Sequence, residues 1–395
     1  MTDNKKYLYL NYYYFTDNGH ARMLYYLATM VVVTKLILAY SEIFVMPDFL
    51  NSVLNYTFIL LMLLKVLGNF NFKLKKMNIA FIVFAVLALY TSIQTDNFII
   101  LFSALGVLGI KGMSVRSIIR TSFKVKVFWL TLHFVCFIFA MSFFPQTVEY
   151  SLIGGEIRHR IYLSQPNTCA MLFLWMFFEY IYLNYEKLYF RKFLTCTLLY
   201  GIILYITKSK TSGIVYALLW LMIFLKNNKV MQKIVLVLSK YGFIILSIFF
   251  AFTTVMYSKL PSVRILNTML TGRLAGAAEA YELYGFTIFG QYLDLGTTID
   301  WDPFYGVTSI WLENTYTMLF INYGIIYAAL VAIALWYVAE YLTGKDIIFV
   351  CAMLIYGISE SYIVNIFLCF PLLVVAGAIF DKRKYLMTNY DIDAS

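Results

Sequence analysis

One polar stretch decides how this chain is organised. Residues 156–167 read Glu-Ile-Arg-His-Arg-Ile-Tyr-Leu-Ser-Gln-Pro-Asn, and the apolar runs on either side are each long enough to cross a bilayer. Cations are costly in or beside hydrocarbon unless an anion compensates them. We therefore interpret the rest of the chain as a scaffold that holds this polar loop at one face of a membrane.

The composition is typical of a polytopic membrane protein. Hydrophobic residues make up 62% of the 395 residues and charged residues only 13%, and the mean hydropathy is +0.76. The net charge of +10 would favour nucleic acid as a partner of a soluble chain, but here it fits basic cytoplasmic loops, so we expect no nucleic-acid partner. The five cysteines lie in apolar runs without metal-ligand spacing. We expect them to be packing residues, and we expect neither a metal nor a cofactor.

Hydropathy predicts an all-α, polytopic integral membrane protein with about 12 transmembrane helices and one long external loop that carries short helices. The three shortest spans, 98–110, 212–225 and 346–358, fall well below the roughly 17 residues that a straight crossing needs, and we expect them to be extended by polar flanks, broken or re-entrant. We expect a single membrane domain over residues 1–395. The predicted spans are 23–43, 49–67, 77–94, 98–110, 123–144, 166–185, 193–207, 212–225, 234–256, 313–338, 346–358 and 363–380.

Basic residues predict the orientation. Most of the 31 Lys and Arg residues fall in loops that share one side with the N-terminus, so we expect both termini to be cytoplasmic. The external cations gather in three loops, 145–165, 207–213 and 257–312, and each needs a physical reason to be there. They are Arg158, Arg160, Lys208, Lys210, Lys259, Arg264 and Arg273.

The loop 257–312 is too long for a simple connection. Its apolar spacing predicts a helix over 274–284, headed by Arg273 and ended by Gly285. Together with loop 145–165 it forms the candidate active-site face. After the helix come Phe289-Gly290-Gln291, the acidic and aromatic residues Asp294, Asp300, Trp301, Asp302, Phe304 and Tyr305, and then Glu313-Asn314 at the mouth of the next span.

These residue types indicate a chemistry. Arginines at a membrane face suit a diphosphate, because the guanidinium group binds phosphate oxygens bidentately and keeps its charge. Aromatic rings and carboxylates suit sugars. Together they predict glycosyl transfer from a lipid diphosphate. A diphosphate leaves without protonation, so one base for the attacking hydroxyl is enough, while arginines stabilise the charge on the leaving group.

The loop cations also have plainer interpretations. Arg158 and Arg160 could bind lipid headgroups, or pair with Glu149 and Glu156. The lysines of the turn 207–213 could be anchors whose stems lie in the membrane and whose ammonium groups reach water.

Three further titratable residues have plain interpretations as well. His159 is a solvated loop histidine in the simplest case. Within the spans, we expect His133 to be hydrogen-bonded and Glu179 to pair locally and not to carry protons.

Four local motifs follow one another along the chain. Residues 158–167 resemble the segment Arg-x-x-x-Gly-Phe-x-x-Pro-Asn, with Tyr162 and Leu163 in place of Gly-Phe. Residues 207–211 resemble a Ser-Arg-Thr turn, with Lys210 in place of Arg. The remaining two are Gly272-Arg273 followed by Phe289-Gly290, which resembles Gly-Arg…Phe-Gly, and residues 313–316 with 322–326, which resemble Asp-Asn-x-Tyr…Tyr-Gly-Ile-Ile with Glu for Asp.

In these motifs the chain resembles the oligosaccharide-repeat-unit polymerases (Wzy type) of Gram-positive bacteria, which belong with the O-antigen ligases in a larger membrane glycosyltransferase group. The resemblance implies a metal-independent, inverting transfer at the outer face of the bacterial cytoplasmic membrane. A growing glycan on undecaprenyl diphosphate would move onto the non-reducing end of an incoming lipid-linked repeat unit, to make capsular polysaccharide or exopolysaccharide. The implied partners are undecaprenyl-diphosphate-linked oligosaccharide, membrane lipid, and the flippase and chain-length regulator of the same pathway.

The resemblance also carries roles onto residues of this chain. It leaves the general base open among Glu313, His159, Asp300 and Glu360, of which we favour Glu313. The expected catalytic residues are Arg158, Arg160, Arg273, Glu313 and His159. The expected substrate-binding residues are Lys210, Asn167, Gln291, Asp300, Trp301 and Tyr316.

Two other functions compete. An enzyme like the O-antigen ligases would use the same site chemistry with a different acceptor. A flippase for lipid-linked oligosaccharide would carry its cations within the spans and often shows repeated halves. Here the unexplained cations lie in predicted external loops, and only one half contains a long loop, so we favour the polymerase.

Overall fold

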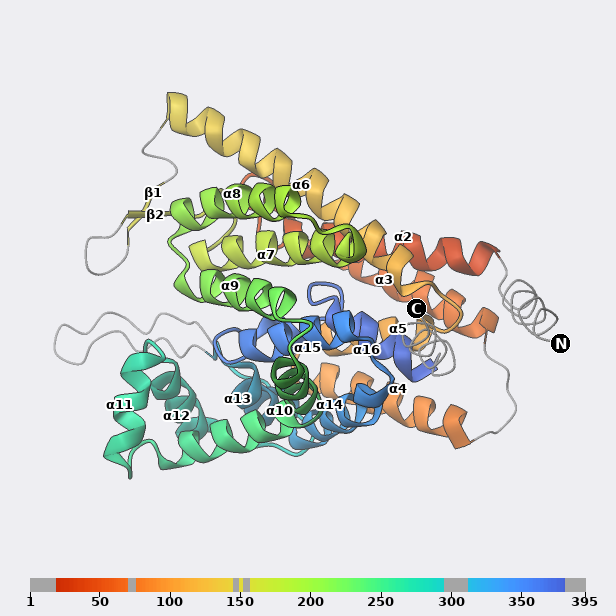
Figure 1. The fold of residues 1–395 in the computed structure, drawn as a ribbon. Coiled ribbons are helices and arrows are strands. Elements are labelled where there is room, and N and C mark those ends of the chain that lie inside the picture. Colours follow the sequence, from red (N-terminus) through yellow and green to blue (C-terminus); the bar gives the residue numbers. More distant parts are fainter. Residues whose placement is uncertain (1–18, 70–75, 145–148, 152–156, 295–311, 381–395) are drawn as a thin grey trace. The chain divides into compact units, whose positions relative to one another are not determined.

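In the residues that the structure describes, the regular elements are helices apart from one short hairpin (Figure 1). The computed structural model describes residues 19–69, 76–144, 149–151, 157–294 and 312–380. The α-helices are α2 (Gly19–Leu38), α3 (Asp48–Asn69), α4 (Lys76–Gln94), α5 (Ile99–Gly109), α6 (Val115–Phe143), α7 (Pro166–Leu183), α8 (Phe190–Thr207), α9 (Lys210–Phe224), α10 (Lys229–Met256), α11 (Pro261–Met269), α12 (Arg273–Tyr284), α13 (Thr315–Met318), α14 (Ile325–Val338), α15 (Gly344–Tyr356) and α16 (Pro371–Phe380). The shorter turns are η2 (Tyr185–Lys187), η3 (Leu319–Tyr323), η4 (Ala339–Tyr341) and η5 (Tyr362–Val364).

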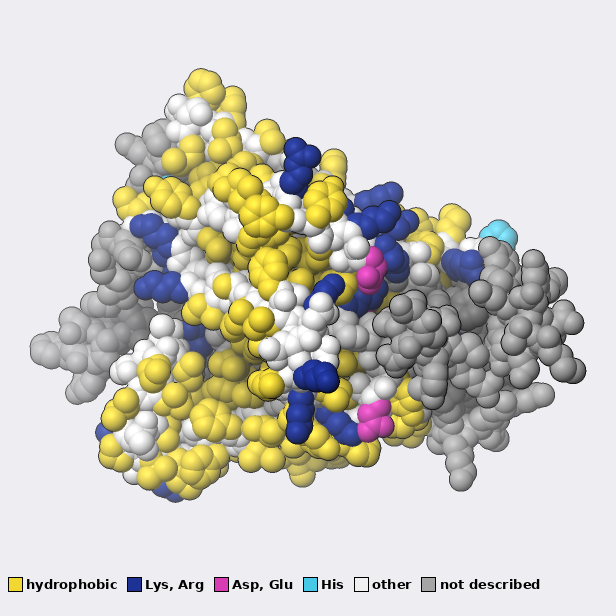
Figure 2. All heavy atoms as spheres, in the orientation of Figure 1, with side chains coloured by type: hydrophobic (Ala, Val, Ile, Leu, Met, Phe, Trp, Pro, Cys, Tyr) yellow, Lys and Arg dark blue, Asp and Glu magenta, His cyan; other side chains and the backbone are white. Residues whose placement is uncertain are grey.

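Five of the helices in these residues, α2, α3, α6, α8 and α10, are long and apolar enough to cross a membrane. Large apolar side chains on them remain exposed, as at Met30, Leu60, Phe128 and Ile248. Figure 2 shows hydrophobic side chains spread over much of the face in view. So much exposed apolar surface fits a helical protein embedded in lipid. The count of about 12 spans stays a prediction.

The expected span 313–338 is not one helix. The chain forms the short helix α13, then the π-helical turn η3, and it breaks at Gly324 before α14 begins. Gly324 has a φ of 97°, and a Cβ added there would lie 2.5 Å from the carbonyl oxygen of Ile288. Only glycine fits this turn, because another chain segment passes against its backbone.

The last expected span, 363–380, is also helical over only part of its length. Helix α16 begins at Pro371, and the residues between η5 and that proline are not helical. Proline favours the first turn of a helix and disfavours helical geometry in the residue before it, so the helix begins there. Of the three short spans, α5 has 11 residues, α9 has 15 and α15 has 13.

The loop 145–165 contains an antiparallel hairpin instead of a plain loop. Strand β1 (Glu149–Ser151) pairs with β2 (Ile157–His159), with Tyr150 opposite Arg158. Strands of three residues are too short to give an alternating pattern in the sequence. The hairpin leads directly to the start of α7.

Contacts divide the chain into two compact units. Unit 1 contains residues 1–74, 105–218 and 366–382. In it, α2 packs against α3 and α6, α6 packs against α7, and α7 packs against α8. Unit 2 contains residues 75–104, 219–365 and 383–395, and its long helix α10 packs against α12, α13, α14 and α15.

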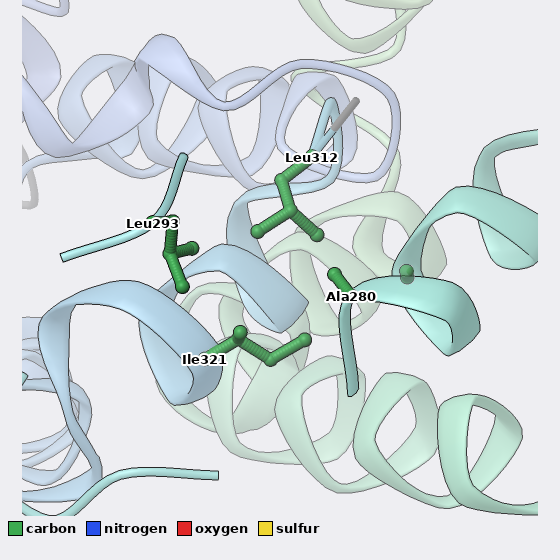
Figure 3. Close-up of a cluster of buried hydrophobic side chains, with 5 residues drawn as sticks. Ala280, Leu293, Leu312 and Ile321 are labelled. Carbon is green, nitrogen blue, oxygen red and sulfur yellow. The ribbon is translucent and has the colours of Figure 1, made fainter. Parts of the chain in front are cut away.

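A cluster of buried apolar residues holds part of unit 2 together (Figure 3). Ala277 and Ala280 of α12 meet Leu293, Leu312 and Ile321. The cluster therefore fixes α12 against η3 and against the segment that enters α13. It supports two predicted site residues, because Arg273 begins α12 and Glu313 follows Leu312 directly.

Truncating this cluster should destabilise unit 2. Leu312→Ala should lower the free energy of unfolding by about 2–4 kcal/mol, since it leaves a cavity where a buried leucine packed. The same substitution at Leu283 on α12 is the control, because Leu283 is 64% exposed and Leu312 only 6%. Thermal unfolding in detergent measures both variants. Equal effects at the two leucines would contradict the assignment of Leu312 to the core.

Candidate functional site

The local fold at the start of α12 fixes Arg273 in place. Gly272 precedes the helix with a φ of 88°, a conformation that favours glycine. The side-chain oxygen of Asn267 accepts hydrogen bonds from the backbone N–H groups of Leu274 and Ala275, at 3.0 and 3.1 Å. The first backbone N–H groups of a helix have no partner within the helix, and these bonds satisfy two of them. They therefore favour a helix that begins at Arg273.

The Arg273 side chain is only 9% exposed and lies between two carboxylates. Its Nε lies 3.0 Å from Oε2 of Glu313 and donates to the carbonyl oxygen of Ser359 at 2.9 Å. Its Nη2 lies 3.7 Å from Oε1 of Glu360. Nη1 also donates to the Thr271 hydroxyl. A nearly buried guanidinium group requires such compensation.

Two short segments bring the carboxylates together. Asn314 caps α13 and donates through its amide nitrogen to the carbonyl oxygen of Ile358 at 2.6 Å. The Thr315 hydroxyl donates to the carbonyl oxygen of Glu360 at 2.5 Å. Glu313 and Glu360 therefore keep their places because the residues beside them are bonded to one another.

The two carboxylates differ in environment. The side chain of Glu313 is 37% exposed, whereas that of Glu360 is 5% exposed. Burial, and then the charge of Glu313, raise the pKa of Glu360 to about 8, although Arg273 acts in the opposite direction. Oε1 of Glu360 accepts no hydrogen bond within the described part of the chain. At neutral pH this arrangement places a proton on Glu360 and leaves Glu313 as the negative partner of Arg273.

Two other predicted site residues, Arg158 and Asn167, contact each other in unit 1. Arg158 donates through Nη2 to the side-chain oxygen of Asn167 at 2.7 Å, and through Nε to the carbonyl oxygen of Thr207 at 2.8 Å. Thr207 ends α8 and is followed by Lys208 and Lys210, both exposed. Neither ammonium group has a hydrogen-bond or ion-pair partner among the residues that the structure describes. Arg158 therefore lies next to a turn that carries two uncompensated positive charges.

Arg160 pairs with a residue that the sequence did not suggest. Its Nη1 lies 2.7 Å from Oε1 of Glu42, and both side chains are about one-third exposed, at 29% and 31%. The backbone N–H of Glu42 donates to the carbonyl oxygen of Tyr162, which holds the two segments together. The partners considered from the sequence, the side chain of Glu149 and residue Glu156, lie outside the described part.

The turn before α7 has unusual backbone geometry. Ile161, Tyr162 and Ser164 have φ values of 50°, 56° and 46°, in the left-handed region that favours glycine. Tyr162 stands where the resembled segment carries Gly. The conformation of Tyr162 is one that glycine adopts at lower cost.

Other predicted residues have local roles in the fold. The His159 ring packs at 5.7 Å, between centroids, against Phe137 of α6. The amide nitrogen of Gln291 donates to the backbone carbonyl of Ile321 at 2.9 Å, and also to those of Tyr284 and Gly285.

Tyr316 is fully buried, donates its hydroxyl hydrogen to the carbonyl oxygen of Leu354 at 2.6 Å, and stacks on Phe250. These contacts give Tyr316 a packing role, and its contact with substrate stays a prediction. Asp300 and Trp301 lie outside the described residues.

Two polar residues within the helices of unit 1, His133 and Glu179, are paired as expected. His133 lies 2.8 Å from the Ser41 hydroxyl through Nε2 and 2.8 Å from the carbonyl oxygen of Trp129 through Nδ1. Glu179 forms a fully buried ion pair with Lys126 at 2.6 Å. The local-pairing interpretation of both residues is confirmed. All five cysteines, each within the described ranges, are free, and four of them are buried.

Comparisons with models of known families, with curated proteins and with solved structures find no match. No group of three or more His, Cys, Asp or Glu side chains in the described part of the chain could hold a metal ion. The chemistry of Arg273, its two carboxylates and the cations of unit 1 therefore carries the functional assignment. Sequence reasoning missed Glu42 and Asn267, whose contacts come from the fold and have no local signature.

The contacts of Arg158 and Lys210 predict unequal effects on the free energy of unfolding. Arg158→Ala should lower the free energy of unfolding by about 1–2 kcal/mol, because the Thr207 carbonyl and the Asn167 amide lose a charged donor. Lys210→Ala should change it by less than about 0.5 kcal/mol, since the ammonium group has no described partner. Thermal unfolding of the two variants in one detergent tests the contrast, and a larger loss at Lys210 would contradict it.

Proposed function

We propose that the protein is a membrane glycosyltransferase that polymerises undecaprenyl-diphosphate-linked oligosaccharide repeat units into capsular polysaccharide or exopolysaccharide. The observation that carries this proposal is the pair of Arg273 and the partly exposed Glu313, backed by the buried Glu360. This arrangement offers one accessible base and one cation, which are the two groups that transfer from a lipid diphosphate requires.

Glu313 is the proposed general base. Its exposed oxygen accepts the proton of the acceptor sugar's hydroxyl while that hydroxyl oxygen bonds to the anomeric carbon of the donor. The bond from that carbon to the diphosphate oxygen breaks, and undecaprenyl diphosphate leaves with the electron pair. The leaving group needs no proton, so no acid is required. Glu360 stays protonated at neutral pH, so Glu313 is the carboxylate that neutralises the charge of Arg273.

Arg273 has two proposed tasks. Its Nε holds Glu313 in a fixed position, which is how a base is kept ready for proton transfer. Its guanidinium group also supplies positive charge that stabilises the departing diphosphate. A lysine has no planar group that could bond a carboxylate, a carbonyl oxygen and a phosphate together, so it should not replace this arginine.

The cations of unit 1 add independent support. Arg158, Lys208 and Lys210 gather at the ends of α8 and α9, and the two lysines have no described partner that would neutralise them. Such a group suits phosphate oxygens. The left-handed geometry of Tyr162, where the resembled polymerases carry Gly, further supports the resemblance.

The proposal includes a topology. The protein lies in a bacterial cytoplasmic membrane with about 12 spans and both termini in the cytoplasm, and the loops 145–165 and 257–312 are external. Its partners are the lipid-linked substrate, membrane lipid, and the flippase and chain-length regulator of the pathway. An enzyme like the O-antigen ligases would share the chemistry and differ in its acceptor.

Transfer should persist in detergent. Purified protein given lipid-linked repeat units and no nucleotide sugar should make a ladder of lipid-linked oligomers, because transfer, unlike transport, needs no two sides. Arg273→Lys should slow the ladder about a hundredfold, which corresponds to about 3 kcal/mol of lost transition-state stabilisation. Gel separation of the labelled lipid-linked products measures both. If protein that binds the substrate returns it unchanged, the polymerase is ruled out in favour of a transporter.

The raised pKa of Glu360 predicts that both the stability of the protein and its rate of transfer depend on pH. This pKa in the folded protein, about 8, lies above that of a free carboxyl, so the folded state holds a proton that the unfolded chain has lost. The stability that this group contributes is present at acid pH and is lost as pH rises towards about 8. Above pH 8, ionised Glu360 competes with Glu313 for Arg273, so transfer should fall.

The variant Glu360→Gln keeps this position neutral and is the matched control. Its transfer rate should not show the fall above pH 8 that the wild-type protein shows. Initial rates from pH 6 to 9.5 provide the comparison. If the two proteins show the same dependence of rate on pH, ionisation of Glu360 does not control transfer.

A further inference from the structure

Helix α10 carries a groove that the proposed reaction does not use. The groove is shallow and open, and all of its described lining residues belong to α10, from Lys229 to Ile245. Two lysines, Lys229 and Lys233, stand at its head. The apolar residues Val230, Ile234, Val237 and Ile245 continue along the helix from there, and all four are exposed.

The spacing of these residues matches a lipid. Lys229 and Lys233 are one turn apart, so their side chains lie on one face of the helix. From Lys229 to Ile245 the helix rises about 24 Å, which exceeds the roughly 15 Å of hydrocarbon in one leaflet of a bilayer. A headgroup held at the lysines would therefore have apolar surface below it for its acyl chains.

The two lysines are also uncompensated. Neither has a hydrogen-bond or ion-pair partner in the part of the chain that the structure describes. Lys240, two turns further along the same helix, contrasts with them, because it pairs with Glu340. Figure 2 shows Lys and Arg side chains over the region where α10 begins in Figure 1, beside hydrophobic ones. The head of the groove therefore carries free positive charge.

We propose that this groove binds an anionic phospholipid. Lys229 and Lys233 hold the phosphate, and an acyl chain lies along Val230, Ile234 and Val237. A zwitterionic phospholipid has the same tails without net charge, so it should bind more weakly. The groove runs from Lys229 to Ile245, and none of its described lining residues belongs to the site around Arg273. The inference therefore needs only a membrane-embedded protein and does not rest on glycosyl transfer.

Binding of short-chain lipids to the purified full-length protein tests the proposal. Native mass spectrometry with dioctanoyl phosphatidylglycerol and dioctanoyl phosphatidylcholine should show a preference for the anionic lipid. The double variant Lys229→Gln, Lys233→Gln should weaken phosphatidylglycerol binding about tenfold or more. Lys259→Gln is the matched control, since Lys259 is an exposed lysine without a described partner that does not line the groove. It should bind the lipid as the wild-type protein does.

A second variant separates a lipid from a free anion. Val237→Trp fills the apolar part of the groove and keeps both lysines, so it should weaken phosphatidylglycerol binding as well. Glycerol phosphate should not compete, because it has no tail. Thermal unfolding without lipid should be unchanged in all variants, since the altered side chains are exposed. Equal binding of the two lipids, competition by glycerol phosphate, unaltered binding by Val237→Trp, or an equal loss in Lys259→Gln would each overturn the proposal.

Discussion

The candidate site in unit 2 depends on the compensation of one nearly buried cation, Arg273. A guanidinium group that loses its water must regain equivalent contacts from the protein. Arg273 obtains them from Glu313 and from the carbonyl oxygen of Ser359, which come from two segments distant in the sequence. This requirement brings the start of α12, the entry to α13 and the turn after α15 together. The same contacts place the partly exposed Glu313 and the buried Glu360 on either side of Arg273, and the proposed function rests on this pair.

Two ion pairs of this protein show how burial separates structural from chemical roles. Lys126 and Glu179 are both fully buried, so no substrate can reach either of them. They tie α6 to α7, and removing one partner would leave a charge without compensation. Glu313 remains partly exposed beside Arg273, so it can meet a hydroxyl group. Accessibility, more than charge, therefore distinguishes the candidate site from the scaffold.

The sequence predicted what local patterns determine. The helix from Arg273 to Tyr284 and its end at Gly285 follow from apolar spacing and from a glycine in the right place, and the structure contains both. The break at Gly324 was missed, because hydropathy does not respond to a π-helical turn or to a neighbouring backbone. The contact of Arg160 with Glu42 joins residues far apart in sequence, so no local motif could predict it.

The central claim is that Glu313 takes the proton of the attacking hydroxyl, and a single-turnover experiment tests it most directly. Donor and acceptor lipids would be bound to wild-type protein and to Glu313→Gln, and formation of the new glycosidic bond would be timed on the enzyme. An amide cannot accept the proton, so the variant should bind both lipids normally and form the bond about a hundredfold or more slowly. Bond formation at the wild-type rate in the variant would contradict the account.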